Sequence, residues 1–165
     1  MFAYGPAAIA TCLALVVGAT SAAAKAPPLC HTRAPQQVAP SSWAPAQTQL
    51  APPGAGTIRL CRYDLERKIA RATLLRRQVW VGKLVRELNV LSPMPSGVVA
   101  CPADLGPLIV ALLAYPDGHT VTISADASGC QAVTNGNLIR TTGVAPPLFG
   151  PKLLTELEHL TGLRA

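Results

Sequence analysis

The clearest pattern in the chain is an uninterrupted apolar run, Leu108–Tyr115, which is followed after a short break by a strictly alternating segment, Thr120–Asp126. An apolar run of this length predicts a strand buried on both faces, with a short buried helix as the alternative. The alternating segment predicts a strand with one buried face and one polar face. Because Pro-Asp-Gly at residues 116–118 supplies turn-forming side chains, the two segments together predict a β-hairpin.

A second strand pair is predicted upstream of this hairpin. Thr57–Tyr63 alternates between apolar and polar residues, which indicates an edge or near-edge strand. Lys68–Leu74 is predicted to pair with it through a turn near residues 64–66. A helix over Glu66–Leu75 is the alternative for this second segment.

A third strand pair is predicted downstream, in residues 131–134 and 137–141. These segments flank Asn135-Gly136, a dipeptide typical of a two-residue hairpin turn. Such a type I′ turn requires positive φ at both central residues, which asparagine and glycine tolerate better than other residues do.

Two helices complete the pattern. Apolar residues recur at helical spacing in Gln78–Leu91, and Pro93 and Pro95 are expected to end this helix. Pro151–Leu160 predicts a C-terminal helix with a leucine stripe. The predicted fold is α+β, with a small antiparallel sheet of about four to six strands, one helix packed on a face, a C-terminal helix and two disulfides.

The N-terminal segment has the features of a signal peptide. Residues 6–24 carry no charge, and the alanines at 22–24 offer a signal peptidase site, so we expect residues 1–24 to be removed on export. Residues 1–5 depart from the usual pattern because they contain no lysine or arginine. The predicted location is secreted or extracellular, and a membrane anchor formed by the uncleaved segment is the alternative.

The next segment, residues 25–56, is rich in proline and alanine. We expect it to be an arm or linker that precedes a single α+β domain, residues 57–165. Its prolines break helices and sheet ladders, but Cys30 can tether it to the domain. Trp43 can pack on its own domain or on a partner, and we favour packing on its own domain.

The chain has five cysteines, and removal of the signal peptide takes Cys12 and leaves four. An even number in an exported chain predicts two disulfides. Four cysteines allow three pairings, and we favour Cys30–Cys61 with Cys101–Cys130 because each pair joins neighbours in the sequence. The absence of a Cys-x-x-Cys motif argues against a zinc ribbon or a thioredoxin-type redox site.

The formal net charge of +6 comes largely from one basic cluster. Such a cluster can bind an anionic polymer by counterion release, but a solvated face that keeps the protein soluble is the favoured interpretation. No aromatic platform or nucleic-acid recognition motif accompanies it. The candidate polyanion patch consists of Arg62, Arg67, Lys68, Arg71, Arg76 and Arg77.

No combination of residues predicts catalysis or cofactor binding. The three histidines, His31, His119 and His159, lack metal-ligand spacing to another His, Cys or Asp. Asp104 and Asp117 fit turns. No nucleophile motif frames the polar residues that are close in sequence, which are His119, Ser124, Asp126 and Ser128. We therefore predict a non-enzymatic protein without a catalytic, cofactor or metal site.

Seven short motifs occur along the chain: PPLC (27–30), LCRY (60–63), ELN (87–89), CPADLG (101–106), YPDG (115–118), GC (129–130) and VTNG (133–136). As a set, they resemble a group of uncharacterised secreted proteins from high-GC actinobacteria. The resemblance implies an extracytoplasmic, disulfide-bonded domain and implies no activity. The basic region between residues 62 and 86 departs from that group.

A fainter likeness is to the Streptomyces-type subtilisin inhibitors, which are also small, secreted proteins with two disulfides and a helix on an antiparallel sheet. The likeness implies a reactive loop at residues 94–102, beside Cys101. Our expectation is a monomeric binding domain for an extracellular protein or an anionic envelope polymer, with a protease inhibitor as the alternative. We expect no specific nucleic-acid partner and no membrane contact after signal cleavage.

Overall fold

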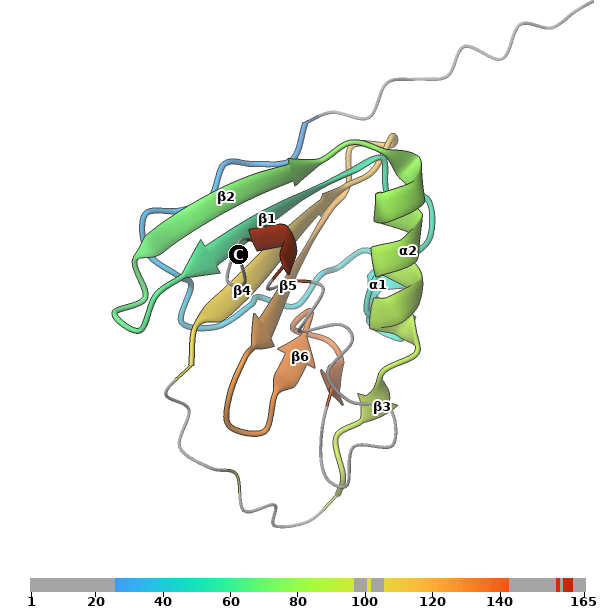
Figure 1. Cartoon of the computed structure of the whole chain (residues 1–165). Coiled ribbons are helices and arrows are strands. Elements are labelled where there is room, and N and C mark those ends of the chain that lie inside the picture. The colour runs from blue at the N-terminus through green and yellow to red at the C-terminus, as the bar shows by residue number, and fades with distance from the viewer. Residues whose placement is uncertain (1–25, 97–100, 102–105, 143–156, 158, 162–165) are drawn as a thin grey trace, which may run out of the picture.

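The computed structural model describes residues 26–96, 101, 106–142, 157 and 159–161, and it shows one seven-stranded antiparallel sheet with a helix on one face (Figure 1). The strand order is β2-β1-β4-β5-β6-β7-β3. The α+β prediction is confirmed, with slightly more strands than expected. The elements are α1 (Ala44–Thr48), β1 (Thr57–Tyr63), β2 (Ile69–Leu75), α2 (Gln78–Asn89), β3 (Ser92–Pro93), β4 (Leu108–Ala114), β5 (Thr120–Asp126), β6 (Ala132–Thr134) and β7 (Ile139–Thr141).

The central hairpin forms as predicted. Every residue of β4 is buried, whereas β5 alternates between buried and more exposed positions. The pairing is in register from Leu108 opposite Asp126 to Ala114 opposite Thr120. Gly118 has a φ of +90° in the connecting turn, a conformation that glycine adopts without strain.

The upstream strand pair and the long helix are also confirmed. β1 is the second strand from one edge and pairs with both β2 and β4, so the helical alternatives for residues 66–75 and 108–115 are excluded. The helix α2 presents an apolar stripe to the sheet, consistent with the helical spacing in the sequence. The buried residues of α2 are Val81, Leu84, Val85 and Leu88.

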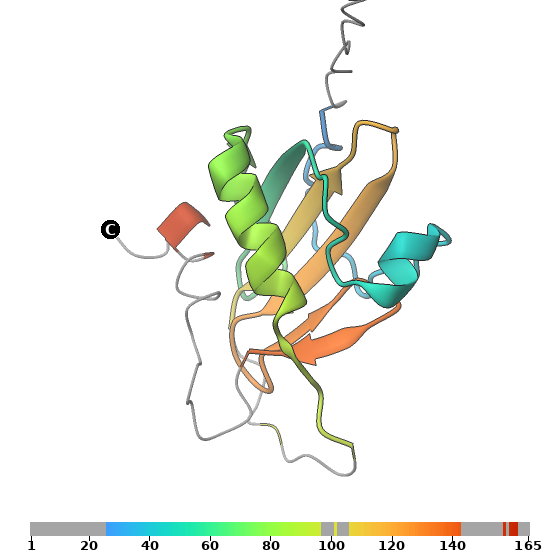
Figure 2. The same cartoon turned by 90° about the vertical axis from the view of Figure 1, so that its right-hand side faces the viewer.

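Different segments cover the two faces of the sheet, which explains why β4 is buried on both sides. On one face, alternate residues of β1, β4 and β5 join α2 and Leu157 in the main core. On the opposite face, a second cluster packs against Cys30 and Ala34 of the N-terminal arm. In Figure 2, α2 lies in front of the sheet and the blue arm passes behind it. The second cluster consists of Cys61, Tyr63, Leu108, Val110 and Leu112.

Part of the predicted arm belongs to the main core. Ala46 of α1 and the alanines and leucine that follow it are buried in the same cluster as α2. Trp43 packs on its own domain, as favoured from the sequence: its ring centroid lies 4.7 Å from that of Tyr115 and 4.8 Å from that of His119. Residues 43–55 of the predicted arm are therefore packed as part of the folded domain.

One detail of the sequence prediction was wrong, and one strand was not predicted. The turn between β6 and β7 is not type I′, because Thr134 pairs with Ile139 across a four-residue loop in which Gly136, but not Asn135, has positive φ. The helix α2 ends before Pro93, as expected, but Pro93 then belongs to the edge strand β3, where its missing N–H costs no ladder hydrogen bond.

Other predictions lie wholly or partly outside the described residues. These are the signal peptide (1–24), Asp104, most of the segment 94–102 and most of the C-terminal helix, of which residues 157 and 159–161 are helical. No helix in the described part of the chain has the length and apolar character needed to span a bilayer.

A prediction of alkaline sensitivity follows from Tyr115, whose side chain is buried and donates a hydrogen bond of 2.8 Å to the carbonyl of Pro52. Burial, with a smaller effect from the charge of Asp117, raises its pKa. The unfolded chain therefore loses this proton first, and stability falls as the pH rises above about 10. Tyr115→Phe should cost about 1 kcal/mol at neutral pH and make the alkaline fall shallower, as measured by urea unfolding. An unchanged alkaline slope would contradict this assignment.

Candidate functional site

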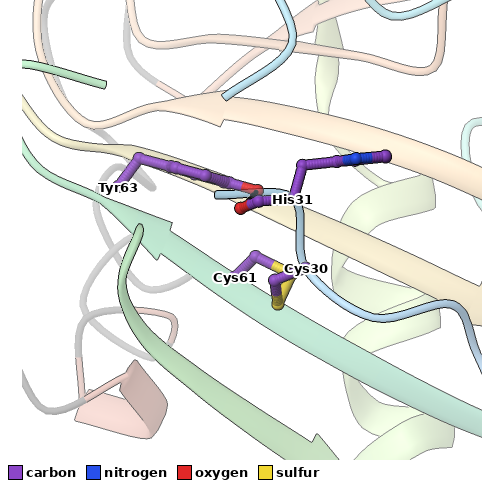
Figure 3. The surroundings of a disulfide bond; sticks show 4 residues. All are labelled: Cys30, His31, Cys61 and Tyr63. Atoms are coloured by element: carbon purple, nitrogen blue, oxygen red, sulfur yellow. Dashed lines mark hydrogen bonds between the residues drawn. A yellow bond between two sulfur atoms is a disulfide. The ribbon is translucent and has the colours of Figure 1, made fainter. Parts of the chain in front are cut away.

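Residues 30–41, here called the strap, cross the sheet face opposite α2. Their first end is fixed to β1 by the Cys30–Cys61 disulfide, with a Cα–Cα distance of 5.7 Å. The Tyr63 hydroxyl donates a hydrogen bond of 3.2 Å to the carbonyl of His31. Figure 3 shows these two attachments side by side, with the His31 imidazole directed away from Tyr63. The predicted pairing of the cysteines is confirmed, since Cys101 and Cys130 form the other bridge.

Backbone contacts hold both ends of the strap. Ile69 N–H donates to the carbonyl of Thr32 at 3.0 Å, and Ala34 N–H donates to that of Arg67 at 2.8 Å. At the far end, Ser41 N–H donates to Asn137 Oδ1 at 2.7 Å, in the β6–β7 loop. The strap is thus attached to the rest of the domain near both of its ends, at residues 30–34 and at Ser41.

A cleft of about 790 Å³ opens between the strap and the end of the sheet where β5 ends and β4 begins. Four separate segments of the chain contribute to its walls, and the strap spans it. The lining residues are Arg33, Ala34, Pro35, Gln36, Gln37, Val38, Glu66, Arg67, Leu108, Ser124, Asp126, Thr134, Gly136 and Ile139. We call this cavity the strap cleft.

A smaller cavity of about 190 Å³ lies under the same strap and shares Pro35, Gln37 and Val38 with the strap cleft. Its walls include the apolar side chains of Val110 and Leu112. The strap therefore has a charged cavity and a largely apolar cavity along its course, which is a suitable arrangement for a ligand with both polar and apolar groups.

The strap cleft offers varied hydrogen-bonding groups. Arg33 and Arg67 supply cationic donors, Glu66 and Asp126 supply carboxylates, and Ser124 supplies a hydroxyl. Among the described residues, no backbone N–H or carbonyl of residues 36–39 has an intramolecular hydrogen-bond partner. These peptide groups are therefore available for hydrogen bonds to a ligand or to water.

Arg67 in the wall of the cleft has a φ of +60°, a conformation that costs a residue with a side chain about 1 kcal/mol. Its N–H donates to the carbonyl of Asp64 in the β1–β2 turn, at a position where glycine is common. A strained residue that lines a cleft suggests that its side chain is retained for binding.

This strain leads to a prediction. Arg67→Gly should raise the free energy of unfolding by about 1 kcal/mol, because glycine adopts positive φ without strain. The same change should weaken ligand binding in the strap cleft about tenfold, through loss of a charged donor. Urea unfolding and titration calorimetry measure the two effects. Leu65→Gly is the matched control in the same turn, because Leu65 is exposed and does not line the cleft. Binding that survives Arg67→Gly would exclude a role for this side chain.

Of the residues considered for catalysis, Ser124 and Asp126 both line the strap cleft, but His119 is not brought close to them. His119 and Asp126 flank opposite ends of β5 and are thus about 20 Å apart. His119 stacks on Trp43, and Asp117 accepts a hydrogen bond of 3.1 Å from His119 N–H, as expected of a turn residue. Among the described residues, no three His, Cys, Asp or Glu side chains are grouped to hold a metal ion.

The six basic residues of the candidate polyanion patch separate into three groups along β2. Arg62 and Arg71 lie directly opposite each other on β1 and β2. Lys68 forms an ion pair with Glu66, and Arg67 lines the strap cleft. Arg76 and Arg77 are exposed between β2 and α2. The six residues therefore lie on or next to the edge strand β2, and one of them, Lys68, is paired with a carboxylate.

Sequence reasoning missed two features. The strap cleft contains Ser124 and Asp126, but its other walls come from segments that no motif connects. Trp80 is 41% exposed at the start of α2, beside Arg76 and Arg77, although no aromatic platform was expected near the basic residues. The sequence did contain a signal for this feature, because Trp80 lies between two arginines that are exposed and Lys83.

Comparison of the chain with models of known protein families finds no match, and comparisons with curated proteins and with solved structures find none either.

Proposed function

We propose that this protein is an exported, disulfide-stabilised binding domain without enzymatic activity, and that its ligand site is the strap cleft. The observation that carries the proposal is a cleft of about 790 Å³ that is spanned by a segment anchored at both ends. Anchoring of the strap by a disulfide and by backbone hydrogen bonds reduces the entropy lost on binding.

Export is supported by two independent observations. The two disulfides indicate an oxidising environment, such as the extracellular space. The uncharged N-terminal segment ends in three alanines, residues 22–24, which match the small-residue pattern of a signal peptidase site. The resemblance to secreted actinobacterial proteins agrees with both. Protein purified from the culture medium should begin at Lys25, and an intact N-terminus on membrane-bound protein would favour the uncleaved anchor.

The chemistry of the strap cleft favours a protein partner over an anionic envelope polymer. The cleft is lined by the two carboxylates of Glu66 and Asp126 as well as by two guanidinium groups, so its described lining has no excess of positive charge to attract a polyanion. None of the described residues that line it is aromatic, so this lining offers no stacking surface on which a sugar ring would pack. An extended polypeptide with both charges and free peptide groups matches the cleft and the exposed backbone of the strap.

A pair of variants on one strand tests this proposal. Ser124 lines the strap cleft, whereas Thr120 lies on the same face of β5 and outside the cleft. Ser124→Tyr should fill the cleft and abolish saturable binding of a partner recovered from culture supernatant and cell envelope. Thr120→Tyr should bind like the wild type. Failure to recover any saturable partner, or equal binding by both variants, would refute the strap cleft as the site.

Protease inhibition is the second candidate function. One observation favours it: two described residues at the predicted reactive segment 94–102 are held, because Pro93 pairs with Arg140 and Cys101 is bridged to Cys130. A loop fixed at both ends can inhibit because it loses little entropy on binding a protease. The mature chain should then slow subtilisin-like proteases at micromolar concentration, and Ser124→Tyr should leave that inhibition unchanged. Absence of inhibition would remove this candidate.

A further inference from the structure

The outer side of α2 carries apolar side chains that are exposed to solvent. Val79 is 65% exposed and Val90 at the C-cap is 79% exposed, and Trp80, about 100° around the helix from Val79 at the edge of this side, is 41% exposed. Val79 and Val90 are eleven positions apart, which places them on the same side of a helix with 3.6 residues per turn, about 16 Å from each other. The opposite side of α2 is the buried stripe, so this helix is apolar on two sides.

Cations surround these apolar residues. Lys83 and Arg86 follow Val79 at intervals of four and seven residues and therefore share its side of the helix. Arg76 and Arg77 are exposed immediately before the helix begins. Glu87 is the single carboxylate in α2, and it forms an ion pair of 3.0 Å with Lys83. The outer side of α2 and the two preceding arginines, here called the α2 face, therefore combine apolar groups with an excess of positive charge.

We propose that the α2 face binds the surface of an anionic lipid bilayer, with Trp80 and Val79 at the level of the headgroups. A helix that is cationic and apolar on the same exposed side lies in the interfacial plane of such a bilayer. Tryptophan prefers this depth, and each nearby cation adds attraction to anionic headgroups. A hydrophilic polyanion would use the cations alone and leave the exposed tryptophan and valines without a role.

The helix α2 and the strap lie on opposite sides of the sheet (Figure 2). A domain bound to a bilayer through α2 therefore presents the strap cleft away from the lipid, where a partner can reach it. This inference concerns a second surface and does not depend on the strap cleft. It departs from the expectation from the sequence that the mature chain does not contact a membrane.

The experiment uses the mature chain with vesicles of equimolar phosphatidylcholine and phosphatidylglycerol, and with vesicles of phosphatidylcholine alone. We expect sedimentation with the anionic vesicles only, accompanied by a blue shift of tryptophan emission that Trp80→Ser removes. Trp80→Ser should weaken binding about tenfold, since it removes the interfacial aromatic ring. Replacement of Lys83 or Arg86 by glutamine should weaken it about fivefold for each cation removed. Circular dichroism verifies that each variant is folded.

Lys68→Gln is the matched control, since Lys68 is an exposed cation in the β1–β2 turn and does not belong to the α2 face. It should bind anionic vesicles like the wild type. Absence of sedimentation with anionic vesicles would overturn the proposal. So would wild-type binding by Trp80→Ser together with full competition by soluble polyphosphate, because the face would then be a polyanion site.

Discussion

Replacement of both Cys30 and Cys61 by alanine should lower the free energy of unfolding by about 4 kcal/mol and release the strap from the sheet. The bridge joins residues 31 positions apart, and without it the unfolded chain gains the entropy of that open loop. Cys61 is also fully buried, so its replacement leaves a small cavity in the second cluster. Urea unfolding measures the loss of stability.

Local release of the strap is detectable by hydrogen exchange. Ala34 N–H and Ile69 N–H form the hydrogen bonds that join the strap to the β1–β2 hairpin. Both amides should lose protection in the variant without the Cys30–Cys61 bridge, and binding in the strap cleft should be lost with it.

The other bridge provides a matched control. Cys101 and Cys130 are 29 positions apart, so replacement of both by alanine should cost nearly the same free energy. The strap does not depend on this bridge, and the Ala34 and Ile69 amides should remain protected. Equal loss of protection in both variants would show that the strap opens through global unfolding, and the Cys30–Cys61 bridge would then have no special role in the site.

The sequence predicted best those elements whose pattern of apolar and polar residues follows from their own local geometry. The all-apolar β4, the alternating β5 and the apolar stripe of α2 each carry a period that follows from local geometry. The burial of β4 on both faces also required a cover on each side of the sheet. The cover on one face, α2, was predicted from the helical period of its apolar residues. The cover on the other face, the strap, is irregular and therefore has no periodic pattern in the sequence.

The candidate site depends on contacts between distant segments, and these leave little trace in a single sequence. The favoured pairing of Cys30 with Cys61 was the one signal that placed the arm against β1. The cleft itself arises because the strap passes over the ends of β4 and β5, a path that also depends on the attachment of Ser41 to Asn137. Its walls could not be identified before these segments were brought together.

Asn135 shows how a residue with a local explanation can have a long-range role. Asn-Gly predicts a tight turn, but the Asn135 side chain is buried and connects the β6–β7 loop to α1. Its Nδ2 group donates to the carbonyls of Ala46, Gln49 and Leu50 at 2.8, 3.1 and 3.1 Å. Its Oδ1 accepts hydrogen bonds of 3.0 and 2.9 Å from two N–H groups of its own loop. The amide thus connects the β6–β7 loop to α1 and to the two residues after its end, Gln49 and Leu50.

Gly136 beside it has a matching role in fixing the strap. Its φ of +85° and the 2.7 Å that would separate a Cβ atom from the backbone of Ala39 and Pro40 leave room for glycine alone. The Asn-Gly pair therefore joins both α1 and the strap to one loop. Its conformation is set by these tertiary contacts and not by the type I′ preference of the dipeptide.

Asn135→Ala should accordingly cost about 3–5 kcal/mol, because it leaves buried carbonyl groups without hydrogen-bond partners. Asn135→Asp keeps the shape of the side chain but directs carboxylate oxygen at those carbonyls, so it should cost at least as much. Asn137→Ala is the matched control in the same loop: its Oδ1 accepts one exposed hydrogen bond, and its loss should cost less than about 1 kcal/mol. Urea unfolding of the three variants distinguishes these values. Similar small losses in all three would mean that α1 is held by its apolar contacts in the main core and not by the Asn135 amide.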